Sequence, residues 1–186
     1  MPTGDRKLTM DELDRVGVDG YSAAQQQRIR VVLDDVRSRH NVGSIFRTSD
    51  AFGVERMHLC GFTPLPPHRE IEKTALGATA SVPWEHAPNT LEVVMELKRQ
   101  GFTVVAVEQT VQAEPLQERL VLANGPLALV FGNEVNGVSD EVIEACDHCV
   151  VVPQRGTKHS LNVSVCAGVV LHAFMAAADV GNFPKV

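Results

Sequence analysis

The sequence predicts an α/β domain with a mostly parallel sheet and helices on both faces. Apolar, β-branched runs of strand length alternate along the chain with segments of helical period, the order found in parallel sheets. The run at 127–131 is apolar throughout and that at 102–107 nearly so, as expected of strands that are covered on both sides. The 186 residues contain no repeat and no low-complexity tract, which favours a single core.

Residues 1–27 are predicted to be an N-terminal extension, and residues 28–180 to form the domain. The extension mixes charged residues with Gly17, Gly20 and a run of glutamines, a composition typical of a short amphipathic piece and a linker. It lacks the apolar segment of a secretory signal, so we expect the protein in the cytoplasm.

Strands and helices are predicted in alternation from residue 29 onward. The strands are expected at residues 29–36, 54–60, 102–107, 127–131 and 150–152. The helices are expected at residues 41–52, 91–99, 140–146 and from 163 through 174. Gly101 is placed to end the second helix, and Ser139 to cap the third. Three prolines at 64–67 exclude regular structure there, and residues 71–86 fit either a loop or a short helix.

The charge of the chain argues against non-specific coating of nucleic acid. The formal net charge is −6 and the pI is near 5.6, whereas phosphate neutralisation requires clustered lysine and arginine. The charge is uneven, however. Residues 28–47 hold five arginines against Asp34 and Asp35, and residues 154–160 are basic without an acid. Such patches are suited to hold an RNA backbone locally.

The cysteines and the apolar C-terminal segment fit ordinary structural roles. Without an export signal, the four cysteines are expected as reduced thiols. Cys146-x-x-Cys149 has metal-like spacing, but a zinc site requires four ligands and only His148 lies close by, so burial is favoured and no metal is predicted. Residues 160–178 lack Asp, Glu, Lys and Arg but include polar side chains, which predicts a buried helix instead of a membrane span.

A first polar island, Asn41-x-Gly43-x-x-x-Arg47-Thr48, lies at the start of a predicted helix. Arg47 is suited to bind a carboxylate or a phosphate with its guanidinium fork. Asn41 is suited to cap the helix, and a capped helix whose arginine pairs with an acid would have the same sequence.

A second island, Phe131-Gly132-Asn133-Glu134-x-x-Gly137, follows a buried strand. Its glycines let backbone amides approach a ligand closely, although a tight turn with a solvated Glu134 would have the same sequence. The G-x-G-x-x-G pattern of a dinucleotide site is absent, which argues against a Rossmann dehydrogenase.

The third island, Pro153-x-x-Gly156-x-x-x-Ser160-Leu161-Asn162-Val163-Ser164, precedes the last helix. Ser160 and Asn162 are suited either to bind a ligand or to cap that helix. The second and third islands and the turn at 108–110 all follow strands. Since ligands of parallel sheets bind beyond the carboxyl ends of strands, these segments are expected to converge on one site.

In this order, the three islands resemble the motifs of the SpoU/TrmH branch of the SPOUT RNA methyltransferases, over about residues 30–174. The resemblance implies transfer of a methyl group from S-adenosylmethionine to a ribose 2′-hydroxyl of tRNA or rRNA, with S-adenosylhomocysteine as the other product and no metal. It also implies a C-terminal trefoil knot and a homodimer. Composition and periodicity alone predict neither of these.

The resemblance also assigns site residues. The positions that match catalysis and ribose positioning are Arg47, Asn41, Glu134, Ser160 and Asn162. The positions that match the cofactor site are Gly132, Asn133, Val152, Pro153, Leu161 and, in the turn after the third strand, Glu108. Since a free arginine stays protonated, we expect Arg47 to clamp a phosphate and stabilise developing alkoxide charge instead of acting as a base.

Two rival functions fit the same sequence. One is a non-catalytic RNA-binding protein of the same fold, and the other is a methyltransferase that acts on another substrate, which the acidic pI would favour. The RNA and its nucleotide stay open at this point. Recognition is expected from the dimer surface, the basic patches, or the segments at 64–68 and 73–78.

Overall fold

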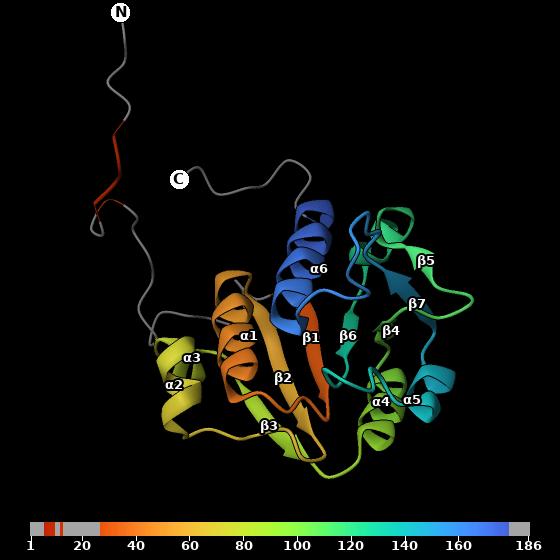
Figure 1. The fold of residues 1–186 in the computed structure, drawn as a ribbon, viewed down its shortest axis with the longest axis horizontal. Coiled ribbons are helices and arrows are strands. Elements are labelled where there is room, and N and C mark those ends of the chain that lie inside the picture. Colours follow the sequence, from red (N-terminus) through yellow and green to blue (C-terminus); the bar gives the residue numbers. More distant parts are fainter. Residues whose placement is uncertain (1–5, 10–11, 13–26, 179–186) are drawn as a thin grey trace, which may run out of the picture.

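The computed structural model describes residues 6–9, 12 and 27–178. These residues form a seven-stranded sheet, all parallel, in the order β3-β2-β1-β6-β4-β7-β5 (Figure 1). The strands are β1 Gln27–Asp34, β2 Val54–Cys60, β3 Trp84–Ala87, β4 Thr103–Val107, β5 Glu114–Pro115, β6 Leu127–Phe131 and β7 His148–Val151. The predicted parallel α/β architecture is confirmed. The predicted extension at 1–27 lies largely outside the described residues.

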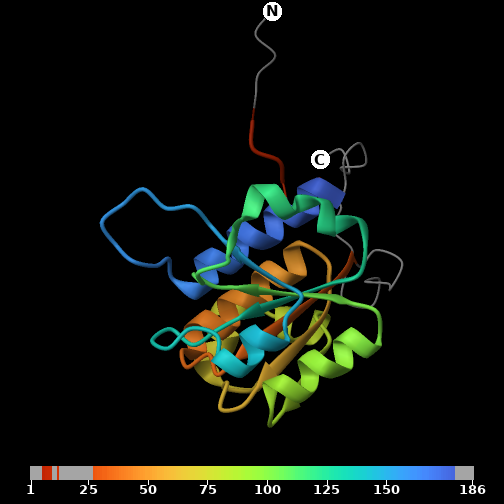
Figure 2. The same cartoon turned by 90° about the vertical axis from the view of Figure 1, so that its right-hand side faces the viewer.

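Helices cover both faces of the sheet, as predicted (Figure 2). They are α1 Arg39–Ala51, α2 Arg69–Ala75, α3 Ala78–Ser81, α4 Thr90–Arg99, the 3₁₀ segment η4 Leu116–Asn124, α5 Asp140–Ala145 and α6 Val163–Ala178. One face packs against α1 and α6, and the other against α4 and α5. Side chains alternate between the two cores along β1: Val31 and Leu33 belong to the first, and Val32 to the second.

The sequence located the central strands and missed the edges. The bounds of β2 and β6 match the prediction, whereas β7 lies at 148–151 instead of 150–152. Strand β1 ends at 34 and not at 36, because Asp35 takes a left-handed backbone with φ 55°. The edge strands β3 and β5 are short and partly exposed, so they lack the apolar runs that reveal buried strands.

Two predicted caps are corrected by the structure. Ser38, not Asn41, caps α1, because its hydroxyl accepts from the Asn41 amide at 3.3 Å. Ser139 occupies the N-cap position of α5, but its hydroxyl donates to Asp34 at 2.9 Å and makes no cap hydrogen bond. Gly101 follows α4 with φ 84°, as a helix-ending glycine should.

The apolar C-terminal segment forms α6, and Ala167, Val170, Leu171 and Phe174 of this helix are fully buried. The predicted buried helix is therefore confirmed. In the described part of the chain, no helix is both long and apolar enough for a membrane crossing.

Candidate active site

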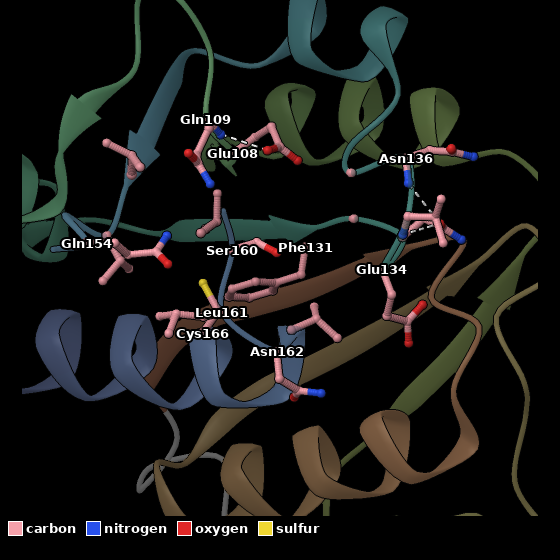
Figure 3. Close-up of a pocket in the computed structure, with 18 of the residues that line it drawn as sticks. Glu108, Gln109, Phe131, Glu134, Asn136, Gln154, Ser160, Leu161, Asn162 and Cys166 are labelled. Atoms are coloured by element: carbon pink, nitrogen blue, oxygen red, sulfur yellow. Dashed lines mark hydrogen bonds between the residues drawn. The ribbon is translucent and has the colours of Figure 1, made fainter. Parts of the chain in front are cut away.

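The second and third polar islands and the turn after β4 meet at the carboxyl edge of the sheet, around a cavity of about 400 Å³. The cavity lies beyond the carboxyl ends of β4, β6 and β7 and is closed on one side by the start of α6 (Figure 3). Of the predicted site residues, those that line it are Glu108, Gly132, Asn133, Glu134, Val152, Ser160, Leu161 and Asn162. Pro153 does not line it, although both of its neighbours do.

The loop after β6 is a tight turn whose glycines are required by geometry. A Cβ on Gly132 would lie 2.1 Å from the Gly137 carbonyl carbon and the Val138 nitrogen. Gly137 itself has φ 71°. The Asn133 side chain is buried and holds the turn from within: its Oδ1 accepts from the Val135 and Asn136 amides at 2.8 and 3.1 Å. Asn133 therefore shapes the cavity wall.

Glu108 joins two walls of the cavity. Its Oε2 accepts from the Val138 amide at 3.0 Å, and its Oε1 accepts from the Gln109 amide at 2.7 Å. Gln109 reaches a third wall, because its Nε2 donates to the His159 carbonyl at 2.6 Å. That loop, residues 153–162, is exposed throughout and projects from the body of the domain (Figure 2). Sequence reasoning missed Gln109, although it stands in the polar turn that was singled out.

Asp34 is a second residue that sequence reasoning missed. It is buried at the end of β1, where its Oδ2 accepts from the Ser139 amide and hydroxyl, both at 2.9 Å. Its Oδ1 accepts from the Thr90 hydroxyl at 2.5 Å. The available signal was an acid at the end of an apolar strand, a position where a buried charge requires partners. Asp34 anchors the end of the loop that follows β6.

Glu134 organises the neighbouring edge of the site. Its Oε2 accepts from the Arg37 amide at 2.8 Å, and its Oε1 accepts from the Ser38 amide at 3.0 Å and the Asn41 Nδ2 at 2.7 Å. Burial works to raise the pKa of Glu134, but these hydrogen bonds outweigh it and hold the pKa below its usual value. Glu134 is therefore ionised at neutral pH and acts as an acceptor. The alternative of a merely solvated Glu134 is wrong.

The three islands are joined in one hydrogen-bonded chain. Asn41 donates to Glu134, 93 residues along the sequence, and accepts from the Asn162 Nδ2, 121 residues away, at 3.1 Å. Asn162 Oδ1 also accepts from the Ser164 amide at 2.9 Å, so the same side chain caps α6. Asn41 lines a smaller cavity beside the first, together with Arg37, Ser38 and Glu134.

Arg47 stands apart from this chain. It is exposed on α1, lines neither cavity, and its guanidinium makes no hydrogen bond or ion pair within the described residues. Buried Val42, Ile45 and Phe46 fix the inner face of α1, which leaves Arg47 toward the outside. The structure thus brings together four of the five predicted catalytic residues and leaves Arg47 outside.

The remaining wall of the cavity is apolar. Phe131, Val150 and Val163 contribute to it, with the thiol of Cys166. Burial raises the pKa of Cys166 to about 11, so this thiol is neutral and behaves as a small apolar group. All four cysteines are free thiols, as predicted.

Comparison with known proteins identifies the family. The model of the SpoU rRNA Methylase family matches residues 28–172. The chain belongs to this family. Its predicted resemblance is therefore confirmed, and the class of activity is that of the family, RNA methylation.

Two curated relatives are named as RNA 2′-O-methyltransferases. The chain is 35% identical over 154 residues to a tRNA (guanosine(18)-2′-O)-methyltransferase of Aquifex aeolicus. The aligned region covers 80% of this chain and 69% of that protein. The chain is 31% identical over 160 residues to the 23S rRNA (guanosine-2′-O-)-methyltransferase RlmB of Vibrio parahaemolyticus, covering 86% of this chain and 64% of that protein. The chain thus spans about two thirds of the length of these relatives.

Solved structures of the family share the fold. The A. aeolicus TrmH/SpoU tRNA modifying enzyme aligns with a TM-score of 0.76 and 31% identity, over 84% of this chain and 78% of that chain. The SpoU methyltransferase AviRb from Streptomyces viridochromogenes, in complex with the cofactor AdoMet, aligns with a TM-score of 0.74 and 25% identity, over 84% of this chain and 62% of that chain. The SPOUT-type α/β fold is confirmed, and the trefoil knot stays a prediction.

The cavity suits the cofactor of the family. Its volume is in the range of small-molecule sites, and its walls combine apolar side chains with backbone. The Gly132 turn brings backbone to the surface of the cavity where a side chain has no room. These are the features expected for a ligand that carries an adenine ring, a ribose and a charged amino acid.

Proposed function

We propose that this chain transfers a methyl group from S-adenosylmethionine to a ribose 2′-hydroxyl of tRNA or rRNA. The observation that supports this most is the hydrogen-bonded chain Glu134–Asn41–Asn162, which joins three motifs beside a cofactor-sized cavity. The relatives named above act on both classes of RNA, so the choice between them rests on experiment.

Methyl transfer from this cofactor requires alignment of the ribose hydroxyl with the methyl group more than it requires acid catalysis. When bound, S-adenosylmethionine supplies a methyl group on a positively charged sulfonium, so the leaving group requires no proton and no metal. The protein must place the ribose hydroxyl in line with this methyl group and favour loss of its proton.

Cofactor binding is assigned to the backbone of the walls. Gly132, Val152, Pro153 and Leu161 would face the cofactor through main-chain atoms and apolar surface. Asn133 and Glu108 would act through the loops that they hold, since backbone amides engage their oxygens and the Asp35 carbonyl engages Asn133 Nδ2.

Ribose positioning is assigned to the polar residues at the junction of the two cavities. Glu134 fixes the orientation of the Asn41 amide, and Asn41 in turn accepts from Asn162. Asn41 and Asn162 thereby form a pair of oriented donors and acceptors next to the cofactor cavity, which Ser160 also lines. Such fixed dipoles are suited to hold a hydroxyl and its neighbour in one geometry.

The place of Arg47 leads us to propose a homodimer with composite sites. Helix α6 leaves Val165 and Val169 54% and 41% exposed, which makes an apolar patch beside α1. In a two-fold dimer formed through α1 and α6, Arg47 would reach the cavity of the partner and clamp the phosphate next to the target ribose.

The direct test is methyl transfer from tritiated S-adenosylmethionine to RNA from cells that lack this protein. Label is expected in RNA as a 2′-O-methyl nucleotide, and its map position identifies the substrate. Label in protein but not in RNA would support the rival methyltransferase activity. RNA binding without any transfer would support the non-catalytic rival.

A further inference from the structure

The loop between β2 and α2 presents an exposed aromatic side chain next to the site. Phe62 is 60% exposed, and Leu65 in the same loop is 38% exposed. Large apolar side chains displayed together on a rigid loop mark interaction surfaces. Neither residue takes part in the site described above.

Phe62 is held on a well-anchored backbone. The Phe62 amide donates to Asp35 Oδ1 at 2.8 Å. The next residue, Thr63, is buried; its hydroxyl donates to the Leu33 carbonyl at 3.2 Å and accepts from the Val36 amide at 3.1 Å. The Phe62 ring therefore projects from a loop that is hydrogen-bonded, at Phe62 and at Thr63, to the end of β1 and the residues after it.

Asp35 connects this loop to the cavity wall. While its carboxylate holds Phe62, its backbone carbonyl accepts from the Asn133 Nδ2 at 2.7 Å. Asp35 also has φ 55°, a conformation that a non-glycine residue keeps only where its surroundings fix it. Two residues further on, the Arg37 amide donates to Glu134. The loop that carries Phe62 is thus linked through Asp35 and Arg37 to the turn that carries Asn133 and Glu134.

Basic side chains are exposed on α2, which follows the Phe62 loop in the chain, and at the start of α1. Arg37, Arg39, Arg69 and Lys73 are exposed at the start of α1 and on α2, which packs alongside α1 (Figure 1). The acids on this face are engaged. Asp35 holds the Phe62 amide, Glu72 accepts from Thr79 at 2.9 Å, and Glu70 lies 3.8 Å from Arg39. These carboxylates keep their charge, so the four basic side chains exceed the three acids by one, and in a chain of net charge −6 this face is locally the more basic.

We propose that this face, defined by Phe62, Arg37, Arg39, Arg69 and Lys73, receives an unpaired RNA segment that flanks the methylated nucleotide. Phe62 stacks on one base, and the basic side chains contact phosphates. An unpaired segment fits because the bases of an A-form duplex are already stacked and out of reach of such a ring. The inference rests on the proposed function, since it supplies the RNA contacts of the same site.

The test measures binding of the full chain to two fluorescent probes, a short single-stranded oligoadenylate and an RNA duplex of the same length. Phe62→Ala is expected to raise the Kd for the single strand roughly 10- to 100-fold and to leave the duplex unchanged. Phe62→Trp should restore binding, because it restores a stacking ring. Met95→Ala is the matched control, since Met95 is 50% exposed on α4, outside this face.

A second readout separates charge contacts from folding. Arg69→Gln and Lys73→Gln should each lower the slope of log K against log salt by roughly 0.7, the value for one single-strand phosphate contact. Arg99→Gln, on α4, should leave the slope unchanged.

The proposal fails if Phe62→Ala binds oligoadenylate like the unaltered protein, if both probes are weakened equally, or if Phe62→Trp binds as weakly as Phe62→Ala. Failure of the proposed function is a separate result. A protein that binds oligoadenylate through Phe62 but transfers no methyl group to RNA overturns that function and keeps this surface. A protein that methylates RNA but does not use Phe62 overturns the surface alone.

Discussion

Replacing Glu134 by glutamine tests the hydrogen-bonded chain most directly. The carboxylate receives three donors: two on Oε1, from Ser38 and Asn41, and one on Oε2, from Arg37. A glutamine keeps a single acceptor oxygen, so its NH₂ group must face at least one of these donors. The variant therefore changes one atom but sets its NH₂ group against either the Arg37 amide or the Ser38 and Asn41 donors, which shifts the segment that carries Asn41.

The magnitude follows from the number of bonds lost. A donor left facing another donor costs about 1–3 kcal/mol when buried, and solvent access at Glu134 reduces this toward about 1 kcal/mol. For a domain of this size that corresponds to a fall in Tm of about 2–4 °C. Methyl transfer should fall more, roughly tenfold or beyond in kcat/KM, because alignment of the ribose depends on Asn41.

The assay compares initial rates of methyl transfer to RNA with thermal unfolding of the same samples. Glu144→Gln is the matched control, since Glu144 is exposed on α5 and makes no hydrogen bond in the described structure. The reasoning is refuted if Glu134→Gln keeps the kcat/KM of the unaltered protein, or if its loss of rate merely tracks its loss of folded protein.

The pH dependence follows with a defined sign. Because the folded pKa of Glu134 lies below its usual value, its contribution to stability is complete above the unfolded pKa of about 4.3. This contribution is lost as pH falls through the folded pKa. Between pH 7 and pH 5 the contribution of Glu134 to the free energy of unfolding should therefore not change with pH. The Glu134→Gln variant should lack only the decrease in this free energy that Glu134 causes at more acidic pH.

Three further predictions concern the dimer and the cofactor walls. If Arg47 acts across a dimer, an equal mixture of inactive Arg47→Ala and Ser160→Ala chains should recover about one quarter of full activity. Half of the dimers in such a mixture contain one chain of each kind, and each of these mixed dimers has one intact site. No recovery after subunit exchange would place Arg47 within its own chain. Gln109→Glu removes the donor to the His159 carbonyl and should raise KM for S-adenosylmethionine roughly three- to tenfold with little change in kcat; calorimetric titration that shows unaltered cofactor affinity would contradict this. Gly132→Ala places a Cβ 2.1 Å from backbone and should cost about 1–3 kcal/mol in stability as well as cofactor affinity, whereas Gly125→Ala, with open space around it, should not.

The central sheet could be predicted because strands that are buried on both faces consist mostly of apolar residues. Strand β6 is such a run and was placed to the residue, and β2 was placed equally well although Glu55, Arg56 and His58 interrupt its apolar residues. The edge strand β3 and the short strand β5 carry mixed residues, since one side of each meets solvent or a loop. These strands pair with neighbours that are distant in the sequence, so the local pattern of residues does not predict the pairing.

The site was predicted where motifs carried it and missed where single residues did. Glu134, Asn41 and Asn162 were found through the islands, and their contacts were found only in the structure. Asp34 and Gln109 belong to none of the three islands, and the local signals at each, an acid at a strand end and a polar turn, do not name a partner. Their roles arise from partners at Ser139 and His159, far along the chain.

Asn162 shows why each island has two interpretations when taken singly. A helix cap and a binding site both require a small polar side chain with a free acceptor and a free donor, so the two roles predict the same residue. In the structure Asn162 fills both: its Oδ1 caps α6 through the Ser164 amide, and its Nδ2 donates to Asn41. The capping hydrogen bond fixes the rotamer of Asn162, and in this rotamer its Nδ2 points toward Asn41. A residue that only capped, such as serine at 162, would keep the helix but lose the link to Asn41. Asn162→Ser should therefore lower methyl transfer far more than it lowers Tm, and equal losses in both would show that the cap is its only role.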